Sequence, residues 1–164
     1  MNSNETKTSP LPSSAACRVL IIGYGNTLRG DDAFGPVVAD RLREAVVSDR
    51  VVVLTRHQLT PELASDVAAC ERVVFIDASV EGPAGQVNCR SISKELSGAG
   101  HLVHTLDPAR LLALAHLVYG RVPTGYLISV GGMSFDLGER RLSPPVAAAV
   151  EPALHQIREL IDAA

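Results

Sequence analysis

The sequence contains neither a long apolar run nor a concentration of basic residues. Its apolar runs, such as residues 111–118, are much shorter than the roughly 20 residues that a membrane-spanning helix needs. The net charge of −3 and the lack of a basic block argue against nucleic acid as a partner. Residues 1–16 are polar and rich in Ser and Pro, without the basic start and apolar core of a secretory signal. We therefore expect a disordered N-terminal tail at residues 1–16, and neither a membrane nor nucleic acid among the partners.

Cysteine is scarce, and the three that occur (Cys17, Cys70 and Cys89) have no CxxC spacing. An odd number of cysteines in a chain without an export signal predicts reduced thiols and a cytoplasmic location. Free cysteines usually behave as small buried hydrophobic residues, so we expect each of the three to lie in the core.

Several catalytic and binding motifs are also missing. The chain has no HExxH zinc-protease motif, no GxSxG nucleophile elbow and no GxxxxGK[ST] phosphate loop. A Gly-x-Gly pair, Gly23 and Gly25, does follow the first apolar run, but Leu28 stands where a dinucleotide-binding loop needs its third glycine. Nucleotide binding therefore rests on two glycines alone, and we expect them to permit a tight turn after the strand.

What the sequence does contain is an alternation of strand-like and helix-like segments. Short apolar runs predict buried strands at residues 18–23, 51–54, 73–76 and 126–130, with a weaker edge strand at 85–92. Apolar residues at helical spacing predict helices at 34–45, 60–70, 107–119 and 145–161, and residues 91–105 are expected to form a long loop. The order βαβαββαβα predicts an α/β fold over residues 17–164: a single-domain three-layer sandwich, in which helices cover both faces of a mostly parallel sheet of about five strands.

The helix ends carry recognisable signals. Thr60 before Pro61 predicts a cap for the second helix, and Asp107 before a proline predicts a cap for the third. Gly120 is placed to end that third helix. Pro152 lies inside the last predicted helix and therefore predicts a kink there.

In a sheet of this kind, ligands bind beyond the carboxyl ends of the strands. Two carboxylates and an imidazole that converge there would form a divalent-metal site. Each residue also has an alternative role: Asp31 or Asp32 would cap the following helix, an acid that ends a strand would be solvated or capped, and a loop histidine would face solvent. The polar residues expected at this edge are Asn26, Asp31, Asp32, His57, Asp77, His104 and Ser134.

The loop after the first strand resembles a family signature. Residues 23–42, GYGNTLRGDDAFGPVVADRL, are similar to the pattern G-x-G-N-x-L-x-x-D-[DE]-x-x-G of the hydrogenase maturation proteases. The similarity continues through VVFIDAS (73–79), HTLDPARLLAL (104–114) and LSPPVAAAVEPALHQI (142–157), so it extends over the chain beyond the tail. Members of this family are endopeptidases, grouped as aspartic-type. They recognise nickel in the precursor of a nickel–iron hydrogenase large subunit and remove its C-terminal extension, and the resemblance implies the same activity here.

Carried over residue by residue, the resemblance implies that Asp32, Asp77 and His104 contact the metal, with Asp32 where many relatives have Glu. The nickel would then belong to the substrate, although zinc or cadmium would also suit these ligands. Asp31 and Asp77 are the candidates for the catalytic role. The expected partner is the precursor of a nickel–iron hydrogenase large subunit, and the expected state is a cytoplasmic monomer. The candidates for contacts with the substrate are Asn26, His57 and Ser134.

One departure from the family pattern leaves a second function open. Many relatives carry Asp-Gly-Gly-Thr after the second strand, with an Asp that is sometimes proposed to be catalytic, and here Thr55 takes the place of that Asp. A non-catalytic, metal-sensing chaperone of the same precursor is therefore the alternative to a protease. Cleavage of a nickel-loaded precursor would distinguish the two.

Overall fold

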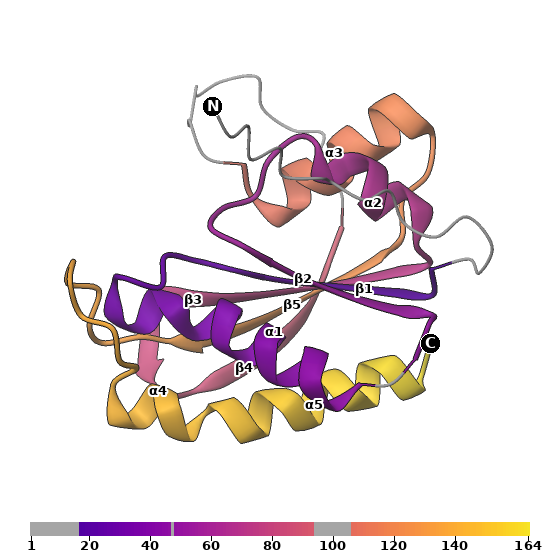
Figure 1. Cartoon of the computed structure of the whole chain (residues 1–164). Coiled ribbons are helices and arrows are strands. Elements are labelled where there is room, and N and C mark those ends of the chain that lie inside the picture. The colour runs from indigo at the N-terminus through magenta and orange to yellow at the C-terminus, as the bar shows by residue number, and fades with distance from the viewer. Residues whose placement is uncertain (1–16, 47, 94–105) are drawn as a thin grey trace, which may run out of the picture.

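Strands and helices alternate along the chain in the predicted order (Figure 1). The structure, a computed structural model, describes residues 17–46, 48–93 and 106–164. The predicted tail at residues 1–16, most of the loop predicted at 91–105, and His104 lie outside the described residues. The elements are β1 (Val19–Tyr24), the 3-10 helix η1 (Gly30–Ala33), α1 (Phe34–Ala45), β2 (Val51–Arg56), α2 (Leu63–Ala69), β3 (Arg72–Ala84), β4 (Val87–Ile92), α3 (Pro108–Tyr119), β5 (Thr124–Gly131), α4 (Pro144–Ala148) and α5 (Val150–Asp162).

The five strands form one sheet in the order β2-β1-β3-β5-β4. The pairs β1–β2, β1–β3 and β3–β5 are parallel, whereas β4 runs antiparallel to β5 at the edge of the sheet. This confirms the mostly parallel sheet and the predicted edge strand. The carboxyl ends of β1, β2, β3 and β5 consequently lie along one edge of the sheet, which is where the predicted site residues follow their strands.

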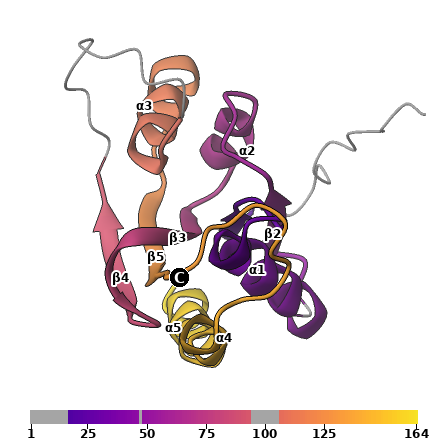
Figure 2. The same ribbon diagram turned by 90° about the vertical axis from the view of Figure 1, so that its left-hand side faces the viewer.

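Strand residues alternate between two apolar layers. In β3, Val74 and Ile76 pack with α1, α4 and α5, whereas Val73 and Phe75 pack with α2 and α3. Figures 1 and 2 show α1, α4 and α5 on one face of the sheet and α2 and α3 on the other. Because successive side chains point to opposite faces, Asp77 lies on the same face as Phe75, the face of α2 and α3. The three-layer sandwich is therefore confirmed.

β3 is longer than its apolar residues predict. We expected Asp77 to close the strand after Ile76, but β3 continues to Ala84. It pairs with β5 as far as Ser79 and, after a register shift, again at Ala84 opposite Gly131. Backbone hydrogen bonds of the sheet do not depend on apolar side chains, so polar residues extend the strand as long as a neighbouring strand runs beside them. Asp77 is thus a side chain on the sheet surface and not the end of a strand.

Both ends of α3 lie where the sequence predicts them, whereas the start of α2 does not. Asp107 caps α3, because its Oδ1 accepts a hydrogen bond from the Arg110 backbone N–H at 2.8 Å, and Gly120 ends the helix in the left-handed conformation at φ 69°. The cap predicted at Thr60 is wrong. Residues 60–62 form a turn, in which the Thr60 carbonyl accepts from the Leu63 N–H at 3.1 Å, and α2 begins at Leu63. The turn keeps the Thr60 side chain bonded to Glu62 instead of to the helix end.

The predicted last helix is divided in two. α4 ends at Ala148 and α5 begins at Val150, so Pro152 lies in the first turn of α5. A proline has no N–H for the carbonyl four residues earlier and its ring clashes with that carbonyl, which here belongs to Ala148. The expected kink is therefore a break at Ala149, a few residues before the proline.

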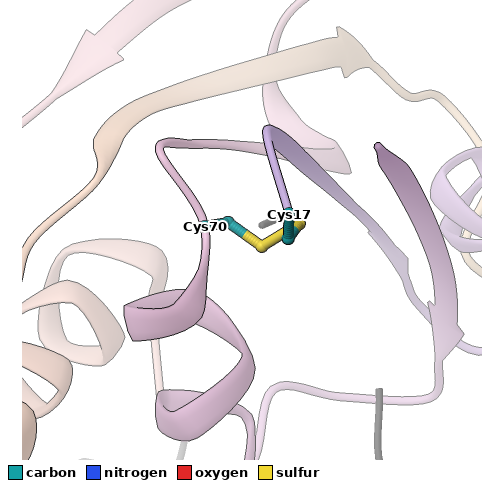
Figure 3. The surroundings of a disulfide bond; sticks show 2 residues. All are labelled: Cys17 and Cys70. Atoms are coloured by element: carbon teal, nitrogen blue, oxygen red, sulfur yellow. A yellow bond between two sulfur atoms is a disulfide. The ribbon is translucent and has the colours of Figure 1, made fainter. Parts of the chain in front are cut away.

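Two of the three cysteines are joined, which corrects the prediction of free thiols. Cys17 and Cys70 form a disulfide with their Cα atoms 4.6 Å apart, and Figure 3 shows it beside the start of β1. Cys17 precedes β1 and Cys70 precedes β3, and these neighbouring strands pair in parallel from Val19 opposite Arg72. The fold thus brings together two cysteines that no spacing motif connects. Cys89 is free and exposed, contrary to the expected burial.

Candidate active site

The loop after β1 turns back on itself at Gly25. This glycine has φ 145°, and a Cβ atom there would lie 1.9 Å from the Asp32 carbonyl oxygen, so no other residue fits. The turn brings the next residue to Asp32: the Asn26 N–H donates to Asp32 Oδ2 at 2.7 Å. The Asn26 side chain in turn accepts from the Leu28 N–H at 2.9 Å and fixes the loop. The tight turn expected of Gly25 is confirmed.

Gly35 and Gly23 serve a different purpose, which is the close packing of α1 on the sheet. A Cβ on Gly35 would lie 2.4 Å from the Ile76 carbonyl oxygen, and one on Gly23 would lie 2.1 Å from the Gly35 carbonyl oxygen. These contacts let the start of α1 approach β1 and β3 directly. The glycines of the signature therefore shape the backbone around the two aspartates that follow Gly30.

Asp31 is buried and its carboxylate is saturated with hydrogen bonds. Oδ1 accepts from the Ser143 N–H at 2.7 Å, while Oδ2 accepts from the N–H groups of Met133 (2.8 Å) and Ser134 (3.0 Å) and from the Ser143 hydroxyl (2.8 Å). Burial alone would raise the pKa of Asp31, but these bonds outweigh it and hold the pKa below its usual value. Neither η1 nor α1 has a side-chain capping bond, so neither Asp31 nor Asp32 caps a helix. Asp31 instead ties the loop after β5 to the start of α1.

The carboxylate of Asp77 has fewer hydrogen-bond partners than that of Asp31. Its Oδ1 accepts from the Ala78 N–H at 2.8 Å, and the Tyr24 hydroxyl bonds the same carboxylate. Burial raises the pKa of Asp77 to about 6, with the negative charge of Asp32 adding to the shift and the two hydrogen bonds opposing it. Burial also raises the pKa of Tyr24, and the neighbouring Asp77 raises it further, so the phenol stays protonated. Asp32 and Asp77 are therefore close enough to repel each other.

These two aspartates line one cavity of about 360 Å³ at the carboxyl end of the sheet. Four of the predicted site residues meet there: Asn26, Asp32, His57 and Asp77. Asp31 and Ser134 do not line it, because they bond to each other in the neighbouring loop. The remaining lining residues are Tyr24, Gly25, Arg29, Gln58, Leu59, Ala78 and Leu106.

Two polar residues of the cavity were missed from the sequence. Tyr24 follows the alternation of Leu20 and Ile22 toward the α2 and α3 face, so the two-residue period of β1 could have placed it. Arg29 reaches the cavity from the loop, where its Nε also donates to the Phe135 carbonyl at 3.2 Å. That contact joins segments more than a hundred residues apart, and no local pattern indicates it.

The chemistry of the cavity suits a hard or borderline divalent cation. Each of its two carboxylates accepts a single backbone N–H, from Asn26 for Asp32 and from Ala78 for Asp77, which leaves oxygens available for a ligand. Within the described residues no group of three or more His, Cys, Asp and Glu side chains is arranged to hold a metal. The third predicted ligand, His104, lies outside those residues.

No protein-family model matches the chain, and no curated protein does either. Solved structures do match. The [NiFe] hydrogenase maturation protease HycI from Thermococcus kodakarensis KOD1 is 30% identical over 91% of this chain and 95% of its own, with a TM-score of 0.69. The chain belongs to the hydrogenase maturation protease family. The hydrogenase 2 maturation peptidase from Thaumarchaeota archaeon SCGC_AB-539-E09 is 28% identical, covering 88% of this chain and 98% of that one at a TM-score of 0.67. The hydrogenase maturating endopeptidase HybD from E. coli is 26% identical, covering 85% and 89% at a TM-score of 0.69.

The structure also shows where Thr55 lies, the residue at which this chain departs from the family pattern. Thr55 lies on the face of α1, where its hydroxyl donates to Asp40 Oδ1 at 2.8 Å and accepts from the Arg43 guanidinium at 2.7 Å. That face is opposite to the one that carries Asp77, and Thr55 does not line the cavity. An Asp at this position would meet Arg43 and not the cavity, so its replacement by Thr leaves the candidate site intact.

Proposed function

We propose that this chain is the endopeptidase that removes the C-terminal extension from the nickel-loaded precursor of a nickel–iron hydrogenase large subunit. One observation carries the proposal: in a hydrogenase maturation protease, Asp32 and Asp77 converge on one cavity with carboxylate oxygens to spare. Thr55 lies on the opposite face of the sheet from the cavity, so its presence in place of Asp does not favour the non-catalytic chaperone.

Nickel enters this cavity as part of the substrate. Asp32 and Asp77 supply carboxylate oxygens and His104 supplies an imidazole nitrogen, a set that borderline metals accept. In the sequence, His104 stands two residues before Leu106, and Leu106 lines the cavity. A bound cation would offset both the burial of Asp77 and its repulsion by Asp32. Zinc or cadmium would bind the same donors, so the discrimination between metals comes from the precursor that presents them.

The peptide bond is hydrolysed by water in an aspartic-type reaction. The water oxygen attacks the scissile carbonyl carbon, a carboxylate accepts the water proton, and the leaving amine takes up a proton as the C–N bond breaks. We assign the proton-accepting role to Asp77 and the positioning of the surrounding loop to Asp31, whose oxygens are already engaged. Asn26, Arg29 and His57 line the same cavity, and we assign contacts with the peptide to them. The anchored nickel orients one peptide bond beside these groups.

The protease acts as a monomer in the cytoplasm. None of the described helices has the length and apolarity that crossing a membrane requires. Cys17 and Cys70 form a disulfide, so the cysteines give this location no support. Thiol labelling of the protein in acid-quenched cells tests it: unlabelled Cys17 and Cys70 would contradict a reducing compartment.

The test of the function is to mix the full chain with nickel-loaded precursor and follow the intact mass of the large subunit. We expect loss of a single C-terminal peptide, and no loss from nickel-free precursor. His104→Ala should abolish the cleavage without unfolding the protein. An unchanged mass, with a known maturation protease active on the same precursor, would overturn the proposal, and stable binding without cleavage would establish the chaperone instead.

A further inference from the structure

A second cavity adjoins the candidate active site on the surface of the sheet. It has a volume of about 510 Å³ and shares Asp77 and Ala78 with the first cavity. Its floor is the part of the sheet formed by β3, β5 and β4, and Figure 2 shows β4 at the outer edge beside β5. We call this second cavity the β4 groove. Its lining side chains include Asp77, Ser79, Asn88, Arg90, Leu127 and Ser129.

The register of the strands orders these side chains into rows. Asp77 pairs with Ser129, and Ser129 pairs with Asn88, so one polar row crosses the sheet from the active site to its edge. The neighbouring row ends at Arg90, which pairs with Leu127. Paired residues share a face of a sheet, so all of them lie on the face that carries Asp77. The β4 groove is therefore a continuation of the active site and not a separate depression.

The charges of the β4 groove are uneven. Arg90 is exposed and forms no ion pair with a carboxylate of the described residues, whereas the nearby Asp107 is already paired with Arg110 at 3.5 Å. Arg90 is the cation of this groove, and its charge acts on the active site because it lowers the pKa of Tyr24 against the larger effects of burial and Asp77. The acidic lining residues, Asp77 and Glu81, belong to β3. An anion would therefore be attracted to the β4 side of the groove and repelled from the β3 side.

We propose that the β4 groove binds the C-terminal extension of the substrate, and that Arg90 pairs with a carboxylate of that extension. The proposal rests on the proposed function, because the extension begins at the bond positioned beside Asp77. The Ser129 and Asn88 side chains provide hydrogen-bond donors and acceptors to an extended peptide that crosses the sheet. Specificity for the extension then resides in β4, while the two carboxylates proposed to contact the metal, Asp32 and Asp77, reside in η1 and β3.

The geometry sets the position of the carboxylate. Two strand spacings and one two-residue step along β4 separate Asp77 from Arg90, which corresponds to about 12 Å between their Cα atoms. An extended peptide advances about 3.3 Å per residue, so the carboxylate lies roughly three or four residues beyond the scissile bond. In a very short extension the terminal carboxylate would occupy this place, and in a longer one an Asp or Glu side chain would.

Binding of the extension can be measured without catalysis. The probe is a fluorescein-labelled synthetic peptide with the sequence of the precursor's extension, followed by fluorescence anisotropy with the full chain. We expect Arg90→Glu to weaken binding by roughly tenfold or more, and Arg90→Lys to retain most of it. The matched control is Arg121→Glu, because Arg121 is exposed and precedes β5 at the opposite end of the strands from Asp77. Circular dichroism checks that each variant is folded.

Peptide variants identify the carboxylate. One peptide has an amidated C-terminus, and others replace single Asp and Glu residues by Asn and Gln. We expect one of these changes to weaken binding to the wild type and to have little further effect on Arg90→Glu. Equal affinity of Arg90→Glu and the wild type would overturn the proposal. So would an equal loss in Arg121→Glu, or a loss in Arg90→Glu that no carboxylate change reproduces.

Processing kinetics separate this proposal from the function on which it rests. With nickel-loaded precursor, Arg90→Glu should raise KM by a factor similar to its loss in peptide binding and leave kcat near the wild-type value. A wild type that never cleaves would overturn the proposed function, while the anisotropy still decides whether the β4 groove binds the peptide. A wild type that cleaves, with an unchanged KM in Arg90→Glu, would overturn the role of Arg90 alone.

Discussion

The loop that follows β5 and the cavity beside it hold their carboxylates in opposite ways. Asp31, which belongs to η1, accepts four hydrogen bonds from this loop, and these bonds outweigh its burial and hold its pKa below the usual value. In the cavity, Asp77 keeps an oxygen with no backbone donor. Burial raises its pKa to about 6, and repulsion by Asp32 adds to the shift. Asp31 and Asp32 are adjacent in sequence, yet they belong to these two different environments.

This difference in hydrogen bonding distinguishes the carboxylate of Asp31, which stabilises the fold, from those of Asp32 and Asp77, which are available to a ligand. A buried carboxylate with all its hydrogen bonds made favours the folded state, because breaking those bonds leaves several donors unpaired. A partly buried carboxylate with few bonds, such as Asp77, disfavours the folded state until a cation or a proton arrives. We therefore expect substitutions in the two regions to affect different measurements.

The largest effect should come from Asp77→Asn, which removes a carboxylate from the cavity. Processing of nickel-loaded precursor should fall by about a hundredfold or more, since both metal contact and proton transfer are lost. The melting temperature of the metal-free protein should not fall. The matched control is Asp49→Asn, an exposed aspartate in the segment before β2, which should process at the wild-type rate. Normal processing by Asp77→Asn would show that the cavity is not the active site.

Asp31→Asn should have the next largest effect, on stability. An amide offers a single acceptor oxygen to the four donors around it, so we expect a loss of about 3 kcal/mol in the free energy of unfolding by urea. Asp136→Asn changes an exposed aspartate in the loop after β5, which supplies these donors, and serves as the control; it should change stability by less than about 0.5 kcal/mol. Equal stabilities of the two variants would mean that Asp31 does not hold the loop.

The pH dependence of stability should distinguish the two carboxylates by sign. The folded pKa of Asp77, about 6, lies above its ordinary value of 3.8, so its contribution to stability is present below pH 3.8 and is lost as the pH rises through 6. Asp77→Asn should therefore be more stable than the metal-free wild type above pH 6, by at most about 3 kcal/mol, and the gain should vanish near pH 4. Asp31 acts oppositely, because its lowered pKa stabilises the fold above pH 3.8 and the contribution is lost in acid. Urea unfolding across this pH range measures both pH dependences. A gain in the stability of Asp77→Asn that does not change with pH would show that the titration of Asp77 does not affect folding.

The smallest effect should come from Ser143→Ala. It removes only the hydroxyl bond to Asp31 Oδ2, whereas the Ser143 backbone N–H still donates to Oδ1 at 2.7 Å. We expect a loss of about 1–2 kcal/mol in urea unfolding, clearly less than for Asp31→Asn. A loss as large as that of Asp31→Asn would mean that the hydroxyl alone holds the carboxylate.

The sequence predicts the fold well because the fold depends on short-range patterns. Apolar runs and helical spacing place the strands and helices, and Asp107 and Gly120 mark the ends of α3 as expected. The clustering of Asp32 and Asp77 also follows, because Asp77 comes directly after the part of β3 that pairs with β1, beside the end of β1 from which the loop to Asp32 starts.

What the sequence does not predict depends on contacts between distant segments. The partners of Asp31 lie more than a hundred residues away, and Cys17 and Cys70 are 53 residues apart. The continuation of β3 beyond Ile76 likewise depends on β5, which pairs with it at residues 77–79 and again at Ala84. These features arise only once the sheet is assembled, so a local pattern around Asp31 could not distinguish a cap, a catalyst and a structural carboxylate.

The most direct test of this division compares Asp31→Asn with Asp32→Asn in the processing of nickel-loaded precursor, followed by the mass of the large subunit. Both variants are assayed below their unfolding temperatures. We expect Asp32→Asn to be as stable as the wild type and to leave the extension attached, while Asp31→Asn is less stable and still removes it. Cleavage by Asp32→Asn at the wild-type rate, with Asp31→Asn folded and inactive, would contradict this division.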